Sequence, residues 1–282
     1  MVINSKQKII VREESVTNPS YGCKPEERPM RQLLEYGVVN INKSQGPTSH
    51  QVADYVKKML DVAKSGHGGT LDPNVTGVLL VTLAKATKVT GLLLRSTKEY
   101  VALMHIHKEV NKERVKEVME KFKGEITQLP PRKSAVKRVK RKREIKELEI
   151  LEIEDKNVLF RVKCQAGTYI RTLIHNIGQE LGTGAHMAQL IRTQTGSFTY
   201  KTWSSLQDVK DAYEYCKEGN EAELRKIVLP FEMLLEKMPK IWIHDSAVSS
   251  ICHGSSLGIP GVSMMTDDIT PEGNVAIMTL KG

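Results

Sequence analysis

One loop of the sequence collects residues that could perform catalysis. The segment SGHGGTLDPNVTG carries four glycines within twelve residues, together with His67, Asp72 and Pro73. Glycines allow close backbone approach, and a residue before proline is held extended, so covalent geometry positions the Asp72 carboxylate. Three interpretations compete: an Asx-type turn, a catalytic carboxylate and a phosphate-binding loop. The last is weak, because neither GxxxxGK(S/T) nor GxGxxG is matched.

A second candidate lies about a hundred residues further on. A nucleophilic or general-base aspartate needs a cation that keeps it ionised and oriented. Arg171 stands at the start of an amphipathic helical pattern, away from the apolar stripe formed by Ile170, Leu173, Ile174, Ile177 and Leu181. Its pairing with Asp72 is therefore a hypothesis for the structure to test.

The positive charge of the chain is concentrated in one segment. The 282 residues carry a formal charge of +9, and residues 132–146 hold nine basic residues against the single acid Glu144. Such a density favours a polyanionic partner, because nucleic acid releases counterions on binding. A solvated basic face or a localisation signal is the alternative. The candidate RNA contacts are Arg132, Lys133, Lys137, Arg138, Lys140 and Arg141.

Composition excludes several classes of protein. With 40% hydrophobic and 27% charged residues the chain is typical of a globular protein, and its longest dense apolar stretch is too short to cross a bilayer. The N-terminus lacks the pattern of a signal peptide. Four scattered cysteines form no CxxC pair. We therefore expect an intracellular protein without membrane contact, and neither a metal nor a cofactor.

The order of predicted elements indicates an α+β fold. A strand at YGVVNIN precedes a helix capped by Thr48 or Ser49, and the glycine-rich loop over residues 65–74 leads to a strand over 78–83. A strand over 99–107 and a helix with Asn111 as N-cap and Gly124 as terminator follow. Two strands over 145–153 and 158–164, joined by a polar turn, complete a hairpin.

Changes in composition divide the chain into three parts. Residues 1–35 are polar with three prolines and predict an extended arm that needs another surface to order it. Residues 36–239 carry the mixed elements of the candidate catalytic domain. Residues 240–282 predict a small β-rich module, which looks short for a core of its own and hence incomplete.

At this point several motifs together resemble a known family. SGHGGTLDPNVTGVL, KEYVALMHIH, PPRKSAVKR and CQAGTYIRTLIHNIGQELGTGAHMAQLIRTQTGSF are similar, in order, to the motifs of the TruB-type pseudouridine synthases. GVVNINKSQGPTSHQV, SAVKRVKRKR and KIWIHDSAVSSICHGSSLGIPG resemble the dyskerin branch, which supplies the catalytic subunits of box H/ACA guide-RNA particles. The C-terminal residues resemble the beginning of a PUA domain, an RNA-binding module.

The resemblance implies roles for single residues. Asp72 matches the aspartate required to cleave the uridine N-glycosidic bond, Tyr100 matches the tyrosine that stacks on the target base, and Arg171 matches the arginine that pairs with the aspartate. The predicted substrate-binding residues are His67, which matches a histidine near the flipped nucleotide, Leu190, which matches an apolar residue lining the pocket, and Lys98 of the KEY segment.

The resemblance also implies an activity and partners. A carboxylate can stabilise or trap the positive charge that develops on a sugar during glycosidic cleavage. We expect an rRNA pseudouridine synthase, with tRNA as a further target and with guide RNA, target RNA and small H/ACA proteins as partners. Its compartment would be the cytoplasm if archaeal-like and the nucleolus if eukaryotic. A stand-alone tRNA pseudouridine synthase and a non-catalytic RNA scaffold are the alternatives.

Overall fold

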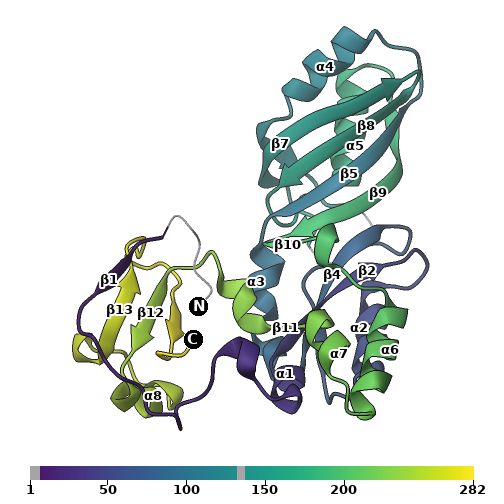
Figure 1. Ribbon diagram of the computed structural model, residues 1–282. Helices are drawn as coiled ribbons and strands as arrows, with labels where there is room; N and C mark the ends of the chain where they lie inside the picture. Colours follow the sequence, from purple (N-terminus) through teal and green to yellow (C-terminus); the bar gives the residue numbers. More distant parts are fainter. Residues whose placement is uncertain (1–6, 132–136) are drawn as a thin grey trace.

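The computed structural model describes residues 7–131 and 137–282, which form a large mixed sheet and a smaller sheet, each flanked by helices (Figure 1). Arg132 and Lys133 of the predicted RNA-binding set lie outside the described residues. The expected α+β fold is confirmed. Among the described residues, no helix is long and apolar enough to cross a membrane.

The large sheet has ten strands. Its order is β11-β2-β4-β9-β5-β8-β7-β6, with β3 paired to β4 and β10 paired to β9. The pairings are antiparallel except between β4 and β9, which run parallel over two residue pairs. The bounds are β2 (Gly37–Lys43), β3 (Ser65–His67), β4 (Thr76–Leu83), β5 (Lys98–Ile106), β6 (Gly124–Gln128), β7 (Arg141–Glu154), β8 (Asn157–Cys164), β9 (Ala185–Thr195), β10 (Phe198–Thr199) and β11 (Val228–Pro230).

Helices cover the two halves of this sheet separately. In Figure 1, α4 and α5 lie in the upper half with β5, β7, β8 and β9, whereas α1, α2, α6 and α7 lie in the lower half with β2, β4 and β11. Each half has its own apolar core, centred on α4 and α5 in one case and on α2 and α6 in the other. The bounds are α1 (Met30–Glu35), α2 (Ser49–Met59), α3 (Thr90–Arg95), α4 (Lys112–Glu120), α5 (Ile170–Glu180), α6 (Leu206–Lys217) and α7 (Ala222–Ile227), with short 3-10 helices η2 (Ala84–Val89), η3 (Tyr200–Thr202) and η4 (Phe231–Leu235).

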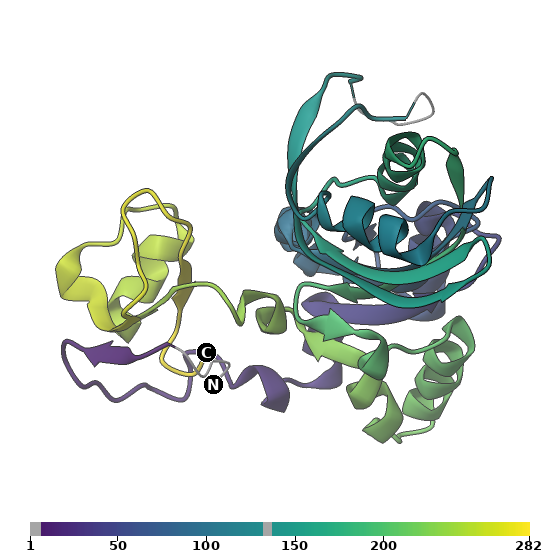
Figure 2. The ribbon, with the colours of Figure 1, turned by 90° about the horizontal axis from the view of Figure 1, so that it is seen from above.

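The smaller sheet joins the two ends of the chain. Its order is β1-β13-β12-β14, made of β1 (Ile9–Val11), β12 (Lys240–Ile243), β13 (Val262–Thr266) and β14 (Ala276–Met278). The 3-10 turns η1 (Pro25–Glu27) and η5 (Ile259–Gly261) and the helix α8 (Asp245–Cys252) accompany these strands. Because β1 pairs with β13, the predicted arm finds its ordering surface on the C-terminal module, which lies beside the large sheet in Figure 2.

Local signals in the sequence account for several element boundaries. Thr48 caps α2 in a capping box with Gln51, and Asn111 caps α4, as predicted. The predicted turn of the β7–β8 hairpin is confirmed, with Asp155 at a φ of +48°.

Two expectations were wrong. The loop predicted over residues 65–74 begins with β3, since Ser65–His67 pairs with β4. Gly124 does not end α4, which stops at Glu120; it opens β6 at a φ of +86° instead. In both places the backbone pairs with a neighbouring strand, although the glycines there suggested a loop or a turn.

Candidate active site

A buried lysine at the end of β2 holds the loop that carries Asp72. The fully buried Lys43 at the end of β2 donates from Nζ to the carbonyl oxygens of Ser44, Pro73 and Val75, at 2.9, 3.2 and 2.9 Å. Burial and the nearby Arg192 guanidinium lower the pKa of Lys43, which the Asp72 carboxylate partly opposes. The backbone on the C-terminal side of Asp72 is thereby tied to β2.

A serine fixes the other side of Asp72. The Ser49 hydroxyl, at the first turn of α2, donates to the Leu71 carbonyl at 3.1 Å and accepts from the Leu71 N–H at 2.8 Å. The Asp72 carbonyl accepts from the Val75 N–H at 3.0 Å. Both flanks of the aspartate are therefore held by buried hydrogen bonds, and its side chain is left half-exposed.

The parallel contact between β4 and β9 requires a glycine. Gly77 has a φ of +106°, and a Cβ there would lie 2.2 Å from the Arg192 carbonyl oxygen. The Arg192 side chain is itself buried, and it donates from Nε to the Val78 carbonyl at 2.7 Å and from Nη2 to the Gly69 carbonyl at 3.0 Å. Arg192 therefore connects β9 with β4 and with the middle of the glycine-rich loop.

Arg171 reaches the site from the first turn of α5. Just before this helix, the buried Gln128 side chain donates to the Tyr169 carbonyl at 3.1 Å and accepts from the Tyr169 N–H at 3.0 Å. This pair of bonds fixes the helix start. From there Arg171 Nη2 donates to Asp72 Oδ2, so the structure brings together the two residues that sequence reasoning had paired.

The ion pair borders a cavity of about 490 Å³ between the two halves of the large sheet. Asp72, Tyr100, Arg171, Leu190 and Lys98 of the predicted set all line it. Among the described residues that line this cavity, Asp72 supplies the one carboxylate. The half-buried Tyr100 lies opposite Arg192 in the register of β5 and β9, and burial raises the pKa of its hydroxyl while Arg192 acts in the opposite sense.

Lys98 borders the cavity without directing its charge into it. Its Nζ donates to the carbonyl oxygens of Leu93, Leu94 and Ser96 at 2.7, 3.1 and 2.8 Å, which closes the end of α3. Burial and the Arg192 guanidinium lower the pKa of Lys98 to about 8. These contacts shape the cavity wall, and the substrate contact predicted for Lys98 stays a prediction.

Two other parts of the predicted set lie further from the cavity. His67 is in β3 and is not among the lining residues; its Nδ1 is buried without a hydrogen-bond partner among the described residues, and burial lowers the pKa of its ring. The basic residues Lys137, Arg138 and Lys140 are exposed on the approach to β7, and Arg141 begins that strand.

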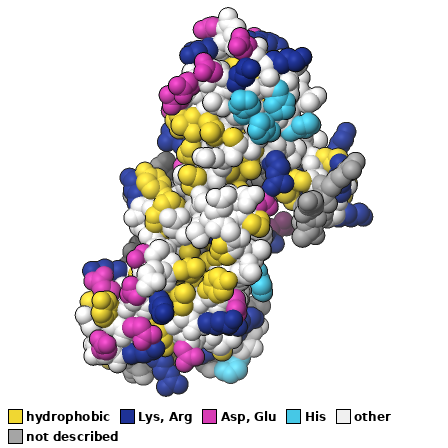
Figure 3. All heavy atoms as spheres, turned by 90° about the vertical axis from the view of Figure 1, so that its right-hand side faces the viewer, with side chains coloured by type: hydrophobic (Ala, Val, Ile, Leu, Met, Phe, Trp, Pro, Cys, Tyr) yellow, Lys and Arg dark blue, Asp and Glu magenta, His cyan; other side chains and the backbone are white. Residues whose placement is uncertain are grey.

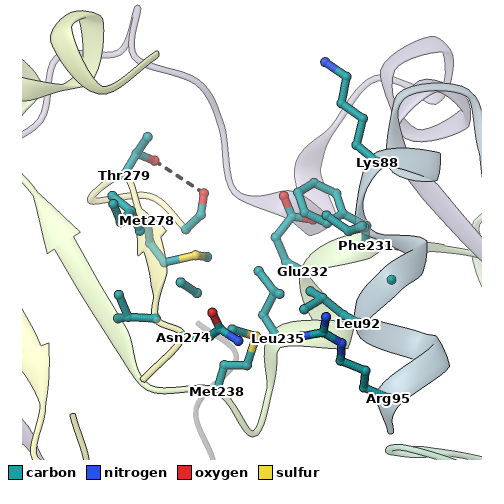
Figure 4. A pocket seen from close by; sticks show the side chains of 16 residues that line it. Lys88, Leu92, Arg95, Phe231, Glu232, Leu235, Met238, Asn274, Met278 and Thr279 are labelled. Carbon is teal, nitrogen blue, oxygen red and sulfur yellow. Dashed lines mark hydrogen bonds between the residues drawn. The ribbon is translucent and has the colours of Figure 1, made fainter. Parts of the chain in front are cut away.

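A separate cavity of about 610 Å³ lies between the large sheet and the C-terminal module (Figure 4). Leu92 and Arg95 of α3 and Phe231 of η4 face Met278 of β14 across it. Its carboxylate, Glu232, pairs with Arg28. It contains none of the predicted catalytic residues.

Sequence reasoning missed three positioning residues, Lys43, Gln128 and Arg192. Each is a polar side chain buried at an inward position of a strand, where an apolar residue is the rule. The signal that could have found them is a polar residue at a position where the alternating pattern of a strand predicts a buried apolar one.

Comparison with known proteins places this site in a family. The model of the TruB family pseudouridylate synthase (N terminal domain) matches residues 57–170, and the tRNA pseudouridylate synthase B C-terminal domain matches residues 171–236. The DKCLD (NUC011) domain matches residues 1–53, and the PUA domain matches residues 239–282. A relative from Methanopyrus kandleri, named probable tRNA pseudouridine synthase B, is 51% identical, covering 98% of this chain and 82% of its own. The chain belongs to the TruB family of pseudouridine synthases.

Solved structures place this pseudouridine synthase within the family. A Cbf5-Nop10-Gar1 complex contains a chain that is 49% identical, with a TM-score of 0.92 over 98% of this chain and 85% of that one. An H/ACA RNP bound to a substrate RNA containing 2'-deoxyuridine contains one at 46% identity and a TM-score of 0.90, over 98% and 85% of the two chains. With the DKCLD match, these findings confirm the dyskerin branch.

Proposed function

We propose that this synthase isomerises uridine in RNA with Asp72 as its catalytic carboxylate. The observation that carries the proposal is the ion pair of Asp72 with Arg171, at the rim of a cavity in which, among the described residues, no second carboxylate takes part. Glycosidases that activate water commonly use two carboxylates. An isomerase that keeps its base and excludes water has no such need.

The chemistry follows from this arrangement. The bond between N1 and C1′ breaks, the base turns, and a bond forms between C5 and C1′. C5 loses its proton and N1 gains one, so no atom is lost overall. Arg171 holds the Asp72 carboxylate in position, and the carboxylate stabilises or traps the cation that develops on the sugar.

Tyr100 and Leu190 form the base-binding walls in this proposal. Both line the cavity, and an aromatic ring beside an apolar side chain suits a base that must rotate without escaping. A uridine in paired RNA must first be extruded, at a cost of a few kcal/mol that stacking in the cavity offsets. Lys98 contributes to a wall of the cavity, whereas His67 lies outside its lining.

Guide RNA is the proposed source of target choice, with rRNA as the main target. The support is the likeness to chains solved in a Cbf5-Nop10-Gar1 complex and in an H/ACA RNP with substrate RNA. We propose corresponding small protein subunits as partners here, and an intracellular location, cytoplasmic in a cell of archaeal type. A stand-alone tRNA synthase is the second candidate, since the curated relatives carry that name.

Tritium release from RNA labelled at uridine C5 tests the catalytic assignment. We expect Asp72→Asn to abolish release while RNA binding and thermal stability persist. Asp155→Asn is the matched control, because the hairpin turn places Asp155 at a positive φ that asparagine tolerates equally well. Undiminished release by Asp72→Asn would remove the carboxylate from the mechanism.

The same assay separates the two candidate functions. Bare tRNA is compared with a target RNA supplied with a matching guide and the small subunits. Release only in the presence of guide supports the H/ACA function. Release from bare tRNA alone supports the stand-alone enzyme.

A further inference from the structure

A short turn leads from β8 into α5 and forms one wall of the catalytic cavity. Gln165, Gly167, Thr168 and Tyr169 all line the cavity. The Thr168 N–H and hydroxyl both donate to the Gln165 carbonyl, at 3.3 and 2.7 Å, which closes the turn. Gly167 has a φ of +78° at the third position, where a turn of this kind favours glycine. Arg171 follows one helical turn later, so the 165–169 turn decides where its side chain begins.

The hairpin of β6 and β7 holds this turn at its two ends. At the far end, the Gln128 side chain of β6 makes its two hydrogen bonds to the Tyr169 backbone. At the near end, the Glu144 N–H of β7 donates to Gln165 Oε1 at 3.3 Å, and the Glu144 carbonyl accepts from the Gln165 N–H at 2.8 Å. These hydrogen bonds leave the middle of the turn, at Gly167, to another contact.

Arg143 of β7 covers the middle of the turn. A Cβ at Gly167 would lie 3.1 Å from Nη2 and 3.2 Å from Nε of Arg143, so the guanidinium lies against the bare face of the glycine. Nη1 donates to the Lys142 carbonyl at 2.7 Å, and the buried Nε has no hydrogen-bond partner among the described residues. The guanidinium therefore meets the turn by packing, for which its planar shape is suited and a lysine ammonium is not.

This contact sets Arg143 apart from the basic residues around it. On the face shown in Figure 3, Lys and Arg side chains lie beside Asp and Glu at both ends of the molecule, as in exposed ion pairs. Lys142, its neighbour on β7, follows this arrangement and pairs with Glu125 at 2.9 Å. Arg143 is half-buried and shares its side of the strand with the buried Ile145. One arginine of the basic segment thus faces the cavity wall.

We propose that Arg143 is a positioning residue of the synthase, which packs on Gly167 and holds the 165–169 turn. Through this turn it sets Arg171 against Asp72, so the inference rests on the proposed function and deepens it. Arg143 is not among the residues that line the cavity, so its loss changes the geometry of the reacting groups and leaves substrate affinity intact. Misplacement of such groups by about 1 Å costs about a hundredfold in rate.

Steady-state tritium release by the chain with guide RNA, target RNA and the small subunits tests this role. Arg143→Lys and Arg143→Met should both lower kcat, by about ten- to hundredfold, and leave KM unchanged. Lysine keeps the charge and loses the planar group, so it should not rescue turnover. Lys142→Met, on the exposed side of the same strand, is the matched control and should keep the wild-type kcat. Full rescue by Arg143→Lys, with a raised KM for Arg143→Met, would make Arg143 a phosphate contact and overturn the proposal.

A double-mutant cycle tests whether Arg143 acts through Gly167. Gly167→Ala presses a Cβ on the guanidinium and should lower kcat, whereas Gly182→Ala should not. Gly182 is the matched control because its φ of +73° strains alanine equally, with no atom within 4 Å of its Cβ position. The loss caused by Arg143→Met should be smaller in Gly167→Ala than in the wild type. Additive losses would mean that the two residues do not act together, which contradicts the proposal.

Hydrogen exchange examines the contact without turnover. The Thr168 and Tyr169 amides should exchange faster in Arg143→Met than in Lys142→Met, while thermal melts show that both variants stay folded. Unchanged exchange together with unchanged kcat would overturn the proposal. Asp72→Asn separates this result from the catalytic assignment: turnover that survives in that variant refutes the role of Asp72, and the exchange experiment still decides whether Arg143 holds the turn.

Discussion

Two groups of cations surround the candidate active site, and the fold uses them in opposite ways. Lys43, Lys98 and Arg192 are buried, and their side chains donate to main-chain carbonyls that shape the cavity. Lys137 and Lys140 are exposed beyond Pro131. Lys140 borders a groove of about 770 Å³ along α5, and the described residues that line this groove include no carboxylate. The comparison suggests a division that can be tested: buried cations position the loop, exposed cations are proposed to hold phosphates, and burial separates the two functions.

The largest expected effect lies where the buried framework is tightest. Gly77→Ala should destabilise the fold by more than about 4 kcal/mol, because the new Cβ would overlap the Arg192 backbone and the φ of +106° is strained for alanine. Chemical denaturation measures this loss of stability. A variant that cannot be obtained as folded protein would also agree with the prediction. Gly91→Ala is the matched control: Gly91 lies in α3 with open space around its Cβ position, and alanine should stabilise it slightly. Equal stability of the two variants would mean that the β4–β9 contact can move apart.

Removal of a buried cation should cause the next largest loss of stability. Arg192→Met leaves the carbonyls of Val78 and Gly69 without their donors, which should lower the free energy of unfolding by about 1–3 kcal/mol. Arg114→Met removes an exposed arginine paired with Glu117 on α4 and should change it by less than about 0.5 kcal/mol. Urea titrations compare the two. A neutral Arg192→Met would show that the loop is held by its other contacts.

The ion pair of Asp72 and Arg171 was a hypothesis from the residues, because short-range signals fixed each partner, and the family resemblance supplied the pairing itself. A proline restrains Asp72, and an amphipathic stripe places Arg171 on the polar side of a helix. Lys43 and Arg192 escaped prediction because their partners are backbone carbonyls brought close only by the sheet order. Gly124 was misread for a similar reason, since the pairing of β6 with β7, a tertiary contact, decides its conformation. Local chemistry was readable from the sequence, and long-range pairing was not.

The pH dependence of stability distinguishes a buried lysine from an exposed one. The pKa of Lys98 is lowered to about 8 in the folded chain against 10.5 as the ordinary value. Between pH 8 and 10.5 the unfolded chain binds more protons at Lys98 than the folded chain does. The free energy of unfolding of the wild type, compared with that of Lys98→Met, should therefore rise with pH by up to about 1.4 kcal/mol per pH unit. This gain is complete above pH 10.5 and is fully lost once the pH has fallen below 8. Urea titrations at pH 8.0 and 9.5 measure it.

Lys123→Met, which removes an exposed lysine paired with Glu120, is the control variant in the same titrations. A difference between wild type and Lys98→Met that stays constant with pH would mean that the Lys98 ammonium stays protonated, held by the three carbonyls around Nζ.

The smallest effect is expected from an exposed cation, and it should appear in binding alone. Lys140→Ala should leave the free energy of unfolding unchanged and reduce the slope of log affinity against log salt by about 0.7 for a single-stranded RNA, the value for one phosphate contact. Anisotropy titrations between low and moderate salt give the slope. Lys123→Ala, which removes an exposed lysine paired with Glu120, should leave the slope as it is. A Lys140→Ala variant with changed stability and an unchanged slope would contradict this division. It would mean that an exposed lysine positions the fold and does not bind phosphate, so that burial does not separate the two functions.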